Sequence, residues 1–128
     1  ILPKRKKQDR GKLTVVLDMD ETLIHSKPDA DAAEMKYNPT LQVEVFKRPG
    51  LDKFLDEAAK HFEVVLFTAA IPIYAKPVLD RIDPKKRLKY RLFRDSTVTF
   101  EGQPYVKDIS LLGRDLSRVV LVDNNPAA

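Results

Sequence analysis

The chain has 128 residues and a formal net charge of +4, and hydrophobic residues make up 43% of it. This length and apolar fraction suit one folded domain and exclude a disordered segment. No apolar run approaches the roughly 20 residues needed to cross a bilayer. The absence of cysteine excludes disulfides, thiolate zinc sites and a cysteine nucleophile. Two histidines, His25 and His61, are too few for a histidine-based metal centre, so any chemistry must depend on carboxylates.

Residues 1–12 contain a basic run, Lys4 to Lys7, and are predicted to be a flexible basic lead-in before a domain that covers residues 13–128. A second set of basic residues occurs within 85–91. Such runs are found on solvated surfaces and on surfaces that bind nucleic acid, acidic membranes or acidic proteins. No nucleic-acid motif and no interleaved aromatic residues accompany them, which favours a solvated surface.

Three short apolar runs, at 13–17, 64–67 and 119–122, are each followed by polar residues. Runs of this length and composition are typical of fully buried strands in a parallel sheet. Reactive groups gather at the carboxyl ends of such strands, so we expect one crevice suited to a metal ion and a phosphate. The polar residues that follow the three runs are Asp18, Asp20, Thr68, Asp123 and Asn124.

The segments between these strands have their own patterns. Residues 26–40 are polar and are predicted to form a loop, whereas 41–46 alternate like a half-exposed strand. Apolar spacing predicts one helix from Leu51 and another over 74–82, with prolines in or near its first turn. The predicted buried helical residues are Leu51, Phe54, Leu55, Ala58, Val78, Leu79 and Ile82, and Phe62 and Phe67 are also assigned to the core.

The segment before the last strand is predicted to contain a hairpin and a short helix. Residues 94–106 are typical of a hairpin that turns at Glu101 and Gly102, where glycine supplies the unusual backbone angle. A helical segment is expected around 110–116, leading into the last strand.

Three carboxylates at one crevice repel each other, so one would take up a proton unless a cation neutralised the group. Oxygen ligands suit Mg²⁺ better than Zn²⁺, and Asn124 adds a neutral amide oxygen. A calcium-binding loop is disfavoured because its glycine and closing glutamate are absent and an apolar strand precedes Asp18. The remaining alternative is structural: Asp20 or Thr22 caps a helix and Asp18 is a turn residue.

Four motifs occur in order: DMDETL at 18–23, FTAA at 67–70, YVKDIS at 105–110 and VDNNP at 122–126. They resemble the four signature motifs of the haloacid dehalogenase superfamily. The residues of these motifs are most similar to those of the phosphatases of the RNA polymerase II C-terminal domain, including the small, NLI-interacting factor-like and Dullard-like forms. KRP at 47–49 and RLFR at 91–94 also resemble that subgroup. The resemblance implies an α/β, Rossmann-like three-layer fold with a central parallel sheet, a small β-hairpin insertion and no large cap domain.

The resemblance also implies a role for each matching residue. Asp18 would be the nucleophile that forms an aspartyl-phosphate. Asp20 would protonate the leaving alkoxide and then activate the hydrolytic water. Thr68 and Lys107 would bind the transferring phosphoryl group, and Arg94 matches an arginine near the phosphate. Structural alternatives stay open for three of these residues. Thr68 would only bond the end of its strand, Lys107 would be an exposed lysine of the hairpin, and Arg94 would be an ordinary surface arginine.

A Mg²⁺ cofactor follows from the same resemblance. Its ligands would be Asp18, the backbone carbonyl of Asp20, and Asn124, with Asp123 a ligand or the hydrogen-bond partner of one. His25 and His61 are expected to be structural or exposed.

The implied function is that of a Mg²⁺-dependent protein serine/threonine phosphatase in the nucleus. Its partner would be a phosphorylated protein segment such as the RNA polymerase II C-terminal domain, with no direct nucleic-acid contact. The segments between the motifs are too small for a separate cap, and an open site favours a protein substrate.

Three alternatives remain. The first is an inactive docking module, as in the mitochondrial translocase receptor that shares this domain, although both aspartates are present. The others are a small-molecule phosphatase or phosphotransferase, and a nucleic-acid binder. Residues 26–40 differ from the family pattern, which leaves the substrate open. The family domain continues into a further strand, so truncation at the C-terminal end is expected.

Overall fold

The computed structural model describes residues 1–28 and 43–125. Residues 29–40 of the predicted loop, residues 41 and 42 of the next predicted strand, and Pro126 lie outside the described residues. The strands of the main sheet are β1 (Leu13–Leu17), β4 (Phe62–Phe67), β5 (Tyr90–Leu92) and β8 (Val119–Val122). Two small sheets pair β2 (Ile24–Pro28) with β3 (Val43–Lys47), and β6 (Val98–Phe100) with β7 (Gln103–Val106). The α-helices are α1 (Leu51–His61) and α2 (Pro72–Ile82).

The main sheet is parallel throughout, in the order β5-β4-β1-β8. This confirms the predicted parallel sheet and adds β5, which is too short to show a pattern in sequence. β4 is buried along nearly all its length, and most of β1 is buried. The prediction of a fully buried last strand is wrong, because β8 has only β1 beside it among the described residues; Val120 and Val122 are 47% and 43% exposed.

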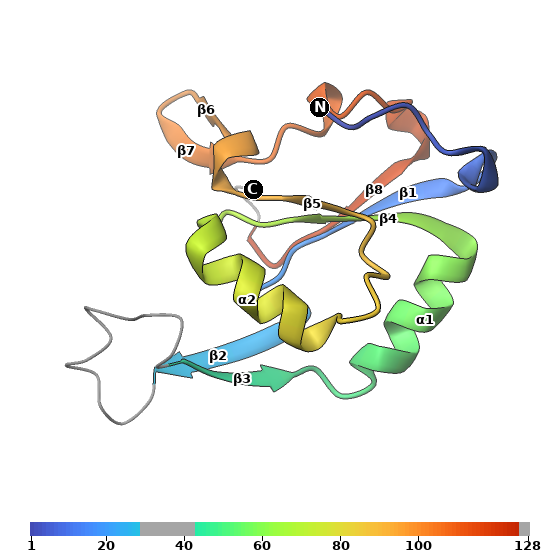
Figure 1. Ribbon diagram of the computed structural model, residues 1–128. Coiled ribbons are helices and arrows are strands. Elements are labelled where there is room, and N and C mark those ends of the chain that lie inside the picture. Colours follow the sequence, from blue (N-terminus) through green and yellow to red (C-terminus); the bar gives the residue numbers. More distant parts are fainter. Residues whose placement is uncertain (29–42, 126–128) are drawn as a thin grey trace.

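Helices α1 and α2 cover the same face of the main sheet (Figure 1). Leu55 of α1 and Leu79 of α2 are fully buried in the core beneath that face. The assignment of Phe54 to the core is wrong: its side chain is 46% exposed. Phe54 lines an apolar pocket between α1 and the edge strand β8, and no described segment of the chain covers this pocket.

Helix α2 begins earlier than predicted and contains both prolines. Pro72 occupies its first turn, where a backbone N–H would lack a helical partner anyway. Pro77 lies inside the helix and removes one helical hydrogen bond. The helix nevertheless forms, because Val78, Leu79 and Ile82 are buried against the sheet as predicted.

The opposite face of the sheet is covered by irregular segments rather than by α-helices (Figure 1). The segment before β1, expected to be a flexible lead-in, packs there: the Leu2 N–H bonds the Leu112 carbonyl at 3.1 Å. Its only regular element is a 3-10 turn at Lys7–Asp9. Asp9 is fully buried and bonds Lys89.

The predicted helix at 110–116 is wrong, since two 3-10 turns occur instead, at Ile109–Leu111 and Leu116–Arg118. Asp108 and Asp115 each accept a hydrogen bond from the N–H two residues ahead, and each caps the start of one of these short turns. Gly113 separates the turns at a φ of +86°.

Ser26 belongs to β2 rather than to the predicted loop, and it pairs with Val45 of β3. Its polar side chain favoured a loop, but backbone pairing with β3 makes it part of a strand. The predicted hairpin is confirmed as β6–β7, and both turn residues have positive φ, +50° at Glu101 and +79° at Gly102. Among the described residues, no helix is long and apolar enough to cross a membrane.

Candidate active site

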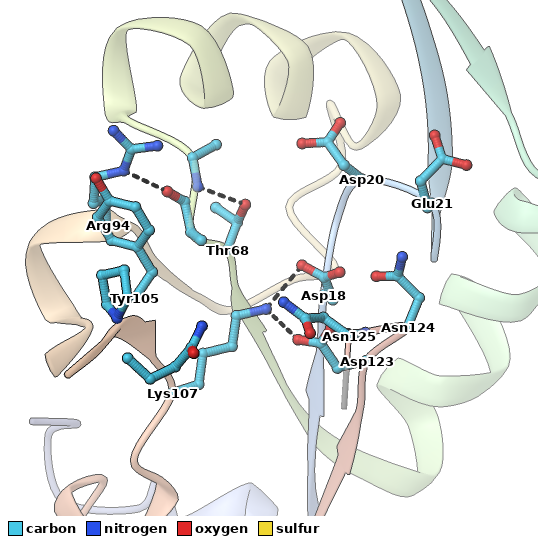
Figure 2. A pocket seen from close by; sticks show the side chains of 14 residues that line it. Asp18, Asp20, Glu21, Thr68, Arg94, Tyr105, Lys107, Asp123, Asn124 and Asn125 are labelled. Atoms are coloured by element: carbon cyan, nitrogen blue, oxygen red, sulfur yellow. Dashed lines mark hydrogen bonds and ion pairs between the residues drawn. The ribbon is translucent and has the colours of Figure 1, made fainter. Parts of the chain in front are cut away.

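A pocket of about 500 Å³ opens at the carboxyl ends of β1, β4 and β8, with the β6–β7 hairpin as one wall (Figure 2). Because the strands are parallel, side chains distant in sequence meet at this edge. All seven predicted site residues line the pocket: Asp18, Asp20, Thr68, Arg94, Lys107, Asp123 and Asn124. Glu21, Ala69, Ala70, Gln103, Pro104, Tyr105 and Asn125 complete the lining.

Lys107 joins the two buried carboxylates of the pocket. Its Nζ donates to Asp18 Oδ1 at 2.9 Å and also pairs with Asp123 Oδ2. The side chain of Lys107 is 3% exposed, which rules out the alternative of an exposed hairpin lysine. Asp123 is held from its other side, because Oδ1 accepts the Asn125 N–H at 2.9 Å. The ammonium therefore neutralises part of the charge that three nearby aspartates bring together.

Asp18 lies at the end of β1 and keeps one oxygen away from Lys107. That oxygen, Oδ2, lies 3.5 Å from the Thr22 hydroxyl. Burial raises the pKa of Asp18 above its ordinary value; the hydrogen bond from Lys107 opposes this shift and the nearby charge of Asp123 adds to it.

Asp20 points away from Asp18, toward the first turn of α2 (Figure 2). The Tyr74 hydroxyl donates to Asp20 Oδ1 at 3.0 Å and lies 2.9 Å from Ser26 Oγ. Burial raises the pKa of Asp20, and the hydrogen bond from Tyr74 opposes that shift. Sequence reasoning missed Tyr74; the only signal was its position six residues after Thr68.

Thr68 directly follows β4 and is almost completely buried. Its backbone N–H bonds the Leu92 carbonyl at 2.9 Å, and its Oγ1 accepts the Ala70 N–H at 3.1 Å. The alternative, a structural role for Thr68, is therefore partly confirmed, because its hydroxyl oxygen accepts a backbone N–H just after the strand. The hydroxyl proton remains available to a ligand in the pocket.

Arg94 lies on the hairpin side of the pocket, across Thr68 from Asp18 (Figure 2). Its Nε donates to the Ala69 carbonyl at 2.7 Å, and its guanidinium stacks on Tyr105 at 4.3 Å from the ring centroid. Tyr105 lines the pocket two residues before Lys107, and sequence reasoning missed it as well as Tyr74.

The pocket offers oxygen ligands of several kinds. No three carboxylate or histidine side chains of the described residues come together as a metal site by themselves. The pocket is lined by the carboxylates of Asp18, Asp20, Glu21 and Asp123 and by the Asn124 amide. Oxygen donors of this kind suit Mg²⁺ when water or phosphate oxygens complete its coordination. Within residues 1–28 and 43–125, the Asn124 amide has no hydrogen-bond partner.

Both histidines lie outside the pocket, as expected. His25 is half exposed and lies 2.5 Å from Glu21, and the exposed His61 lies 3.7 Å from Glu57.

Most of the basic residues within 85–91 form ion pairs with aspartates of the same chain. Arg87 pairs with Asp52, Asp56 and Asp83, and its side chain is 10% exposed. Arg91 pairs with Asp83 as well, at 3.2 Å. Arg87 and Arg91 are therefore neutralised by neighbouring aspartates, whereas Lys85 and Lys86 are exposed.

Comparisons with known proteins identify relatives. The family model for NLI interacting factor-like phosphatases matches residues 13–128. The human carboxy-terminal domain RNA polymerase II polypeptide A small phosphatase 1 is 47% identical over 134 residues, covering 100% of this chain and 51% of the relative. The CTD small phosphatase-like protein 1 of Caenorhabditis elegans is 42% identical, covering 100% of this chain and 27% of the relative. The chain thus spans about half the length of such relatives, or less.

A solved structure shares the fold. The structure of Fcp1, an essential RNA polymerase II CTD phosphatase, matches with a TM-score of 0.69 and 26% identity, over 89% of this chain and 38% of that one. The predicted α/β architecture around a parallel sheet is therefore confirmed.

Proposed function

Because the chain belongs to the NLI interacting factor-like phosphatase family of the haloacid dehalogenase superfamily, we propose that it removes phosphate from serine or threonine in a protein substrate. The observation that carries this proposal is the buried contact between Asp18 and Lys107. It presents a carboxylate and an ammonium group side by side at the sheet edge, where the phosphoryl group would be bound. The other pocket residues surround this pair.

In the proposed first step, Asp18 Oδ2 attacks phosphorus, since Lys107 holds Oδ1. The bond from phosphorus to the serine or threonine oxygen breaks, and Asp20 gives that oxygen a proton. Water then attacks the aspartyl-phosphate, Asp20 takes a proton from it, and inorganic phosphate leaves Asp18. Asp20 lies across the pocket from Lys107 (Figure 2), so acid and cation would act on different sides of the phosphoryl group.

Thr68 and Lys107 are the proposed ligands of the transferring phosphoryl group. The Thr68 hydroxyl would donate a hydrogen bond, and the Lys107 ammonium would stabilise the negative charge on phosphoryl oxygens in the transition state. Arg94 would add a second cation from the hairpin side. These donors are fixed before substrate binds, which reduces the reorganisation that the reaction requires.

Mg²⁺ is the proposed cofactor. Asp18, the Asp20 backbone carbonyl and Asn124 would hold it, with Asp123 as a further ligand or a partner that orients one. The ion would offset the negative charge of the carboxylates and the incoming phosphate.

A protein substrate is favoured because no separate cap domain covers the pocket within the described residues, so an extended segment could reach Asp18. The relatives are named as phosphatases of the RNA polymerase II C-terminal domain. We therefore propose phosphorylated segments of that kind as substrates, and the nucleus as the place of action.

The test is hydrolysis of p-nitrophenyl phosphate by the full-length protein, with Mg²⁺, with EDTA, and with the Asp18→Asn variant. Turnover that requires both Mg²⁺ and Asp18 supports the mechanism. No turnover by a folded, Mg²⁺-supplied protein contradicts it and favours the docking module. Comparing phosphoserine peptides with sugar phosphates then separates a protein phosphatase from a small-molecule phosphatase.

A further inference from the structure

The guanidinium group of Arg94 is fixed from two directions. Its Nε donates to the Ala69 carbonyl at 2.7 Å, and its flat face lies 4.3 Å from the centroid of the Tyr105 ring. The two terminal nitrogens have no acceptor among the described residues, and Arg94 lines the pocket. The group is therefore restrained while both terminal nitrogens remain available to donate to a ligand.

The ring reaches Arg94 because of an irregularity in the hairpin. Val98 pairs with Val106 and Phe100 pairs with Gln103, so Thr99 alone faces both Pro104 and Tyr105. A bulge of this kind redirects a side chain and is frequent next to active sites.

The backbone of Tyr105 adopts the conformation that the bulge demands. Its φ is +59°, a left-handed value that bulky side chains rarely adopt and that glycine would tolerate. A ring that is 46% exposed gains little from burial in this position. Strained residues of this type persist where surrounding structure holds them, commonly at ligand sites.

We propose that Tyr105 is a positioning residue, which the bulge turns onto Arg94 so that the guanidinium is held ready for phosphate. This inference rests on the proposed function, because it assigns Arg94 to phosphate binding there. Tyr105 itself needs no contact with the substrate. Its contribution is to limit the conformations of an otherwise flexible side chain, which lowers the entropy cost of binding.

The experiment measures kcat and KM for p-nitrophenyl phosphate, and the inhibition constant of inorganic phosphate, in full-length variants. Tyr105→Ala is expected to raise KM and the inhibition constant about two- to fivefold, the range of an exposed cation–π contact, with little change in kcat. Tyr105→Phe keeps the ring and is expected to restore both constants. Phe100→Ala is the matched control, since Phe100 is an exposed aromatic residue of the same hairpin that does not line the pocket.

Coupling to Arg94 separates positioning from a general effect on the fold. In an Arg94→Ala background, replacing Tyr105 is expected to change KM no further. Tyr105→Gly removes the ring while suiting the positive φ, so it tests the same loss in a chain that folds without strain. An unchanged KM in Tyr105→Gly, or an equal further loss in the Arg94→Ala background, overturns the inference.

Failure of the proposed function has a different signature. Calorimetric titration of the Asp18→Asn variant with inorganic phosphate measures binding without turnover. If the wild-type protein shows no Asp18-dependent turnover but Tyr105→Gly weakens phosphate binding, the function is wrong and the inference stands. If turnover depends on Asp18 but Tyr105→Gly binds phosphate normally, the inference is wrong and the function stands.

Discussion

Lys107 Nζ donates a hydrogen bond of 2.9 Å to Asp18 Oδ1 inside the fold, although 89 residues separate them in the chain. The same nitrogen pairs with Asp123, whose side chain is only 4% exposed. One ammonium group thus compensates two buried carboxylates. Removing it leaves like charges close together where water cannot screen them well.

Lys107→Met is therefore expected to lower the free energy of unfolding by about 3 kcal/mol, the cost of breaking a buried ion pair from one side. Urea unfolding in EDTA measures it without a cation that could replace the ammonium. Lys107→Met combined with Asp123→Asn has one charge fewer and should recover part of the loss. Equal urea midpoints for wild type and Lys107→Met would contradict the prediction.

Tyr74→Phe should affect substrates according to their leaving groups. The variant loses the hydroxyl that bonds Asp20 at 3.0 Å, so the proposed acid is less well positioned. We expect kcat for a phosphoserine peptide to fall about fivefold, the value of one hydrogen bond. Turnover of p-nitrophenyl phosphate should change little, because p-nitrophenolate leaves without a proton. Equal losses with both substrates would mean that Tyr74 acts through the fold instead.

Tyr90→Phe is the matched control for Tyr74→Phe and a prediction in itself. The Tyr90 hydroxyl is buried with no hydrogen-bond partner among the described residues. Removing it should raise the free energy of unfolding by about 1 kcal/mol, because an unpaired buried hydroxyl costs at least that much.

Thr14→Val should lower the free energy of unfolding instead, since the Thr14 hydroxyl donates to Glu63 at 2.8 Å. Thermal unfolding of both variants measures the contrast.

Stability should fall in acid because of Glu63. Burial favours a higher pKa for Glu63, but hydrogen bonds from Arg114 and Thr14 outweigh it and lower the pKa below its ordinary value of 4.5. The unfolded chain then binds protons more readily than the folded one. The stabilisation is complete above pH 4.5 and is lost as pH falls from there through the lower, folded-state pKa.

Glu63→Gln tests this acid dependence because it cannot titrate. The stability gap between wild type and Glu63→Gln should be largest near neutral pH and should shrink below about pH 4.5. Urea unfolding at several pH values measures the gap. A gap that is constant with pH would show that Glu63 does not titrate differently in the two states.

The candidate pocket could be predicted from sequence because its residues follow strands. An apolar run such as that of β4 must be buried, and parallel strands bring their carboxyl ends to one edge of the sheet. These two rules are enough to bring Asp18, Thr68 and Asp123 together. The motif resemblance added Lys107 and Arg94, which no strand pattern places.

Tyr74 and Tyr105 could not be predicted in this way. The contact of Tyr74 with Asp20 depends on where the first turn of α2 crosses the end of β1, and that of Tyr105 with Arg94 depends on a hairpin bulge. Neither position differs in sequence from an ordinary surface tyrosine. Ser26 also looks like a loop residue until β3 pairs with it.

The sequence by itself determined β1, β4 and β8 and the polar residues that follow them, because a continuous apolar run is a property of neighbours along the chain. Tertiary structure decided how deeply each strand is buried. The VVLV of β8 resembles the VVLF of β4, yet Val64 and Val65 are 1% and 0% exposed whereas Val120 is 47% exposed. β4 lies between β1 and β5, while β8 has only β1 beside it in the described chain. Burial of a strand depends on what packs around it, and those neighbours come from distant parts of the chain.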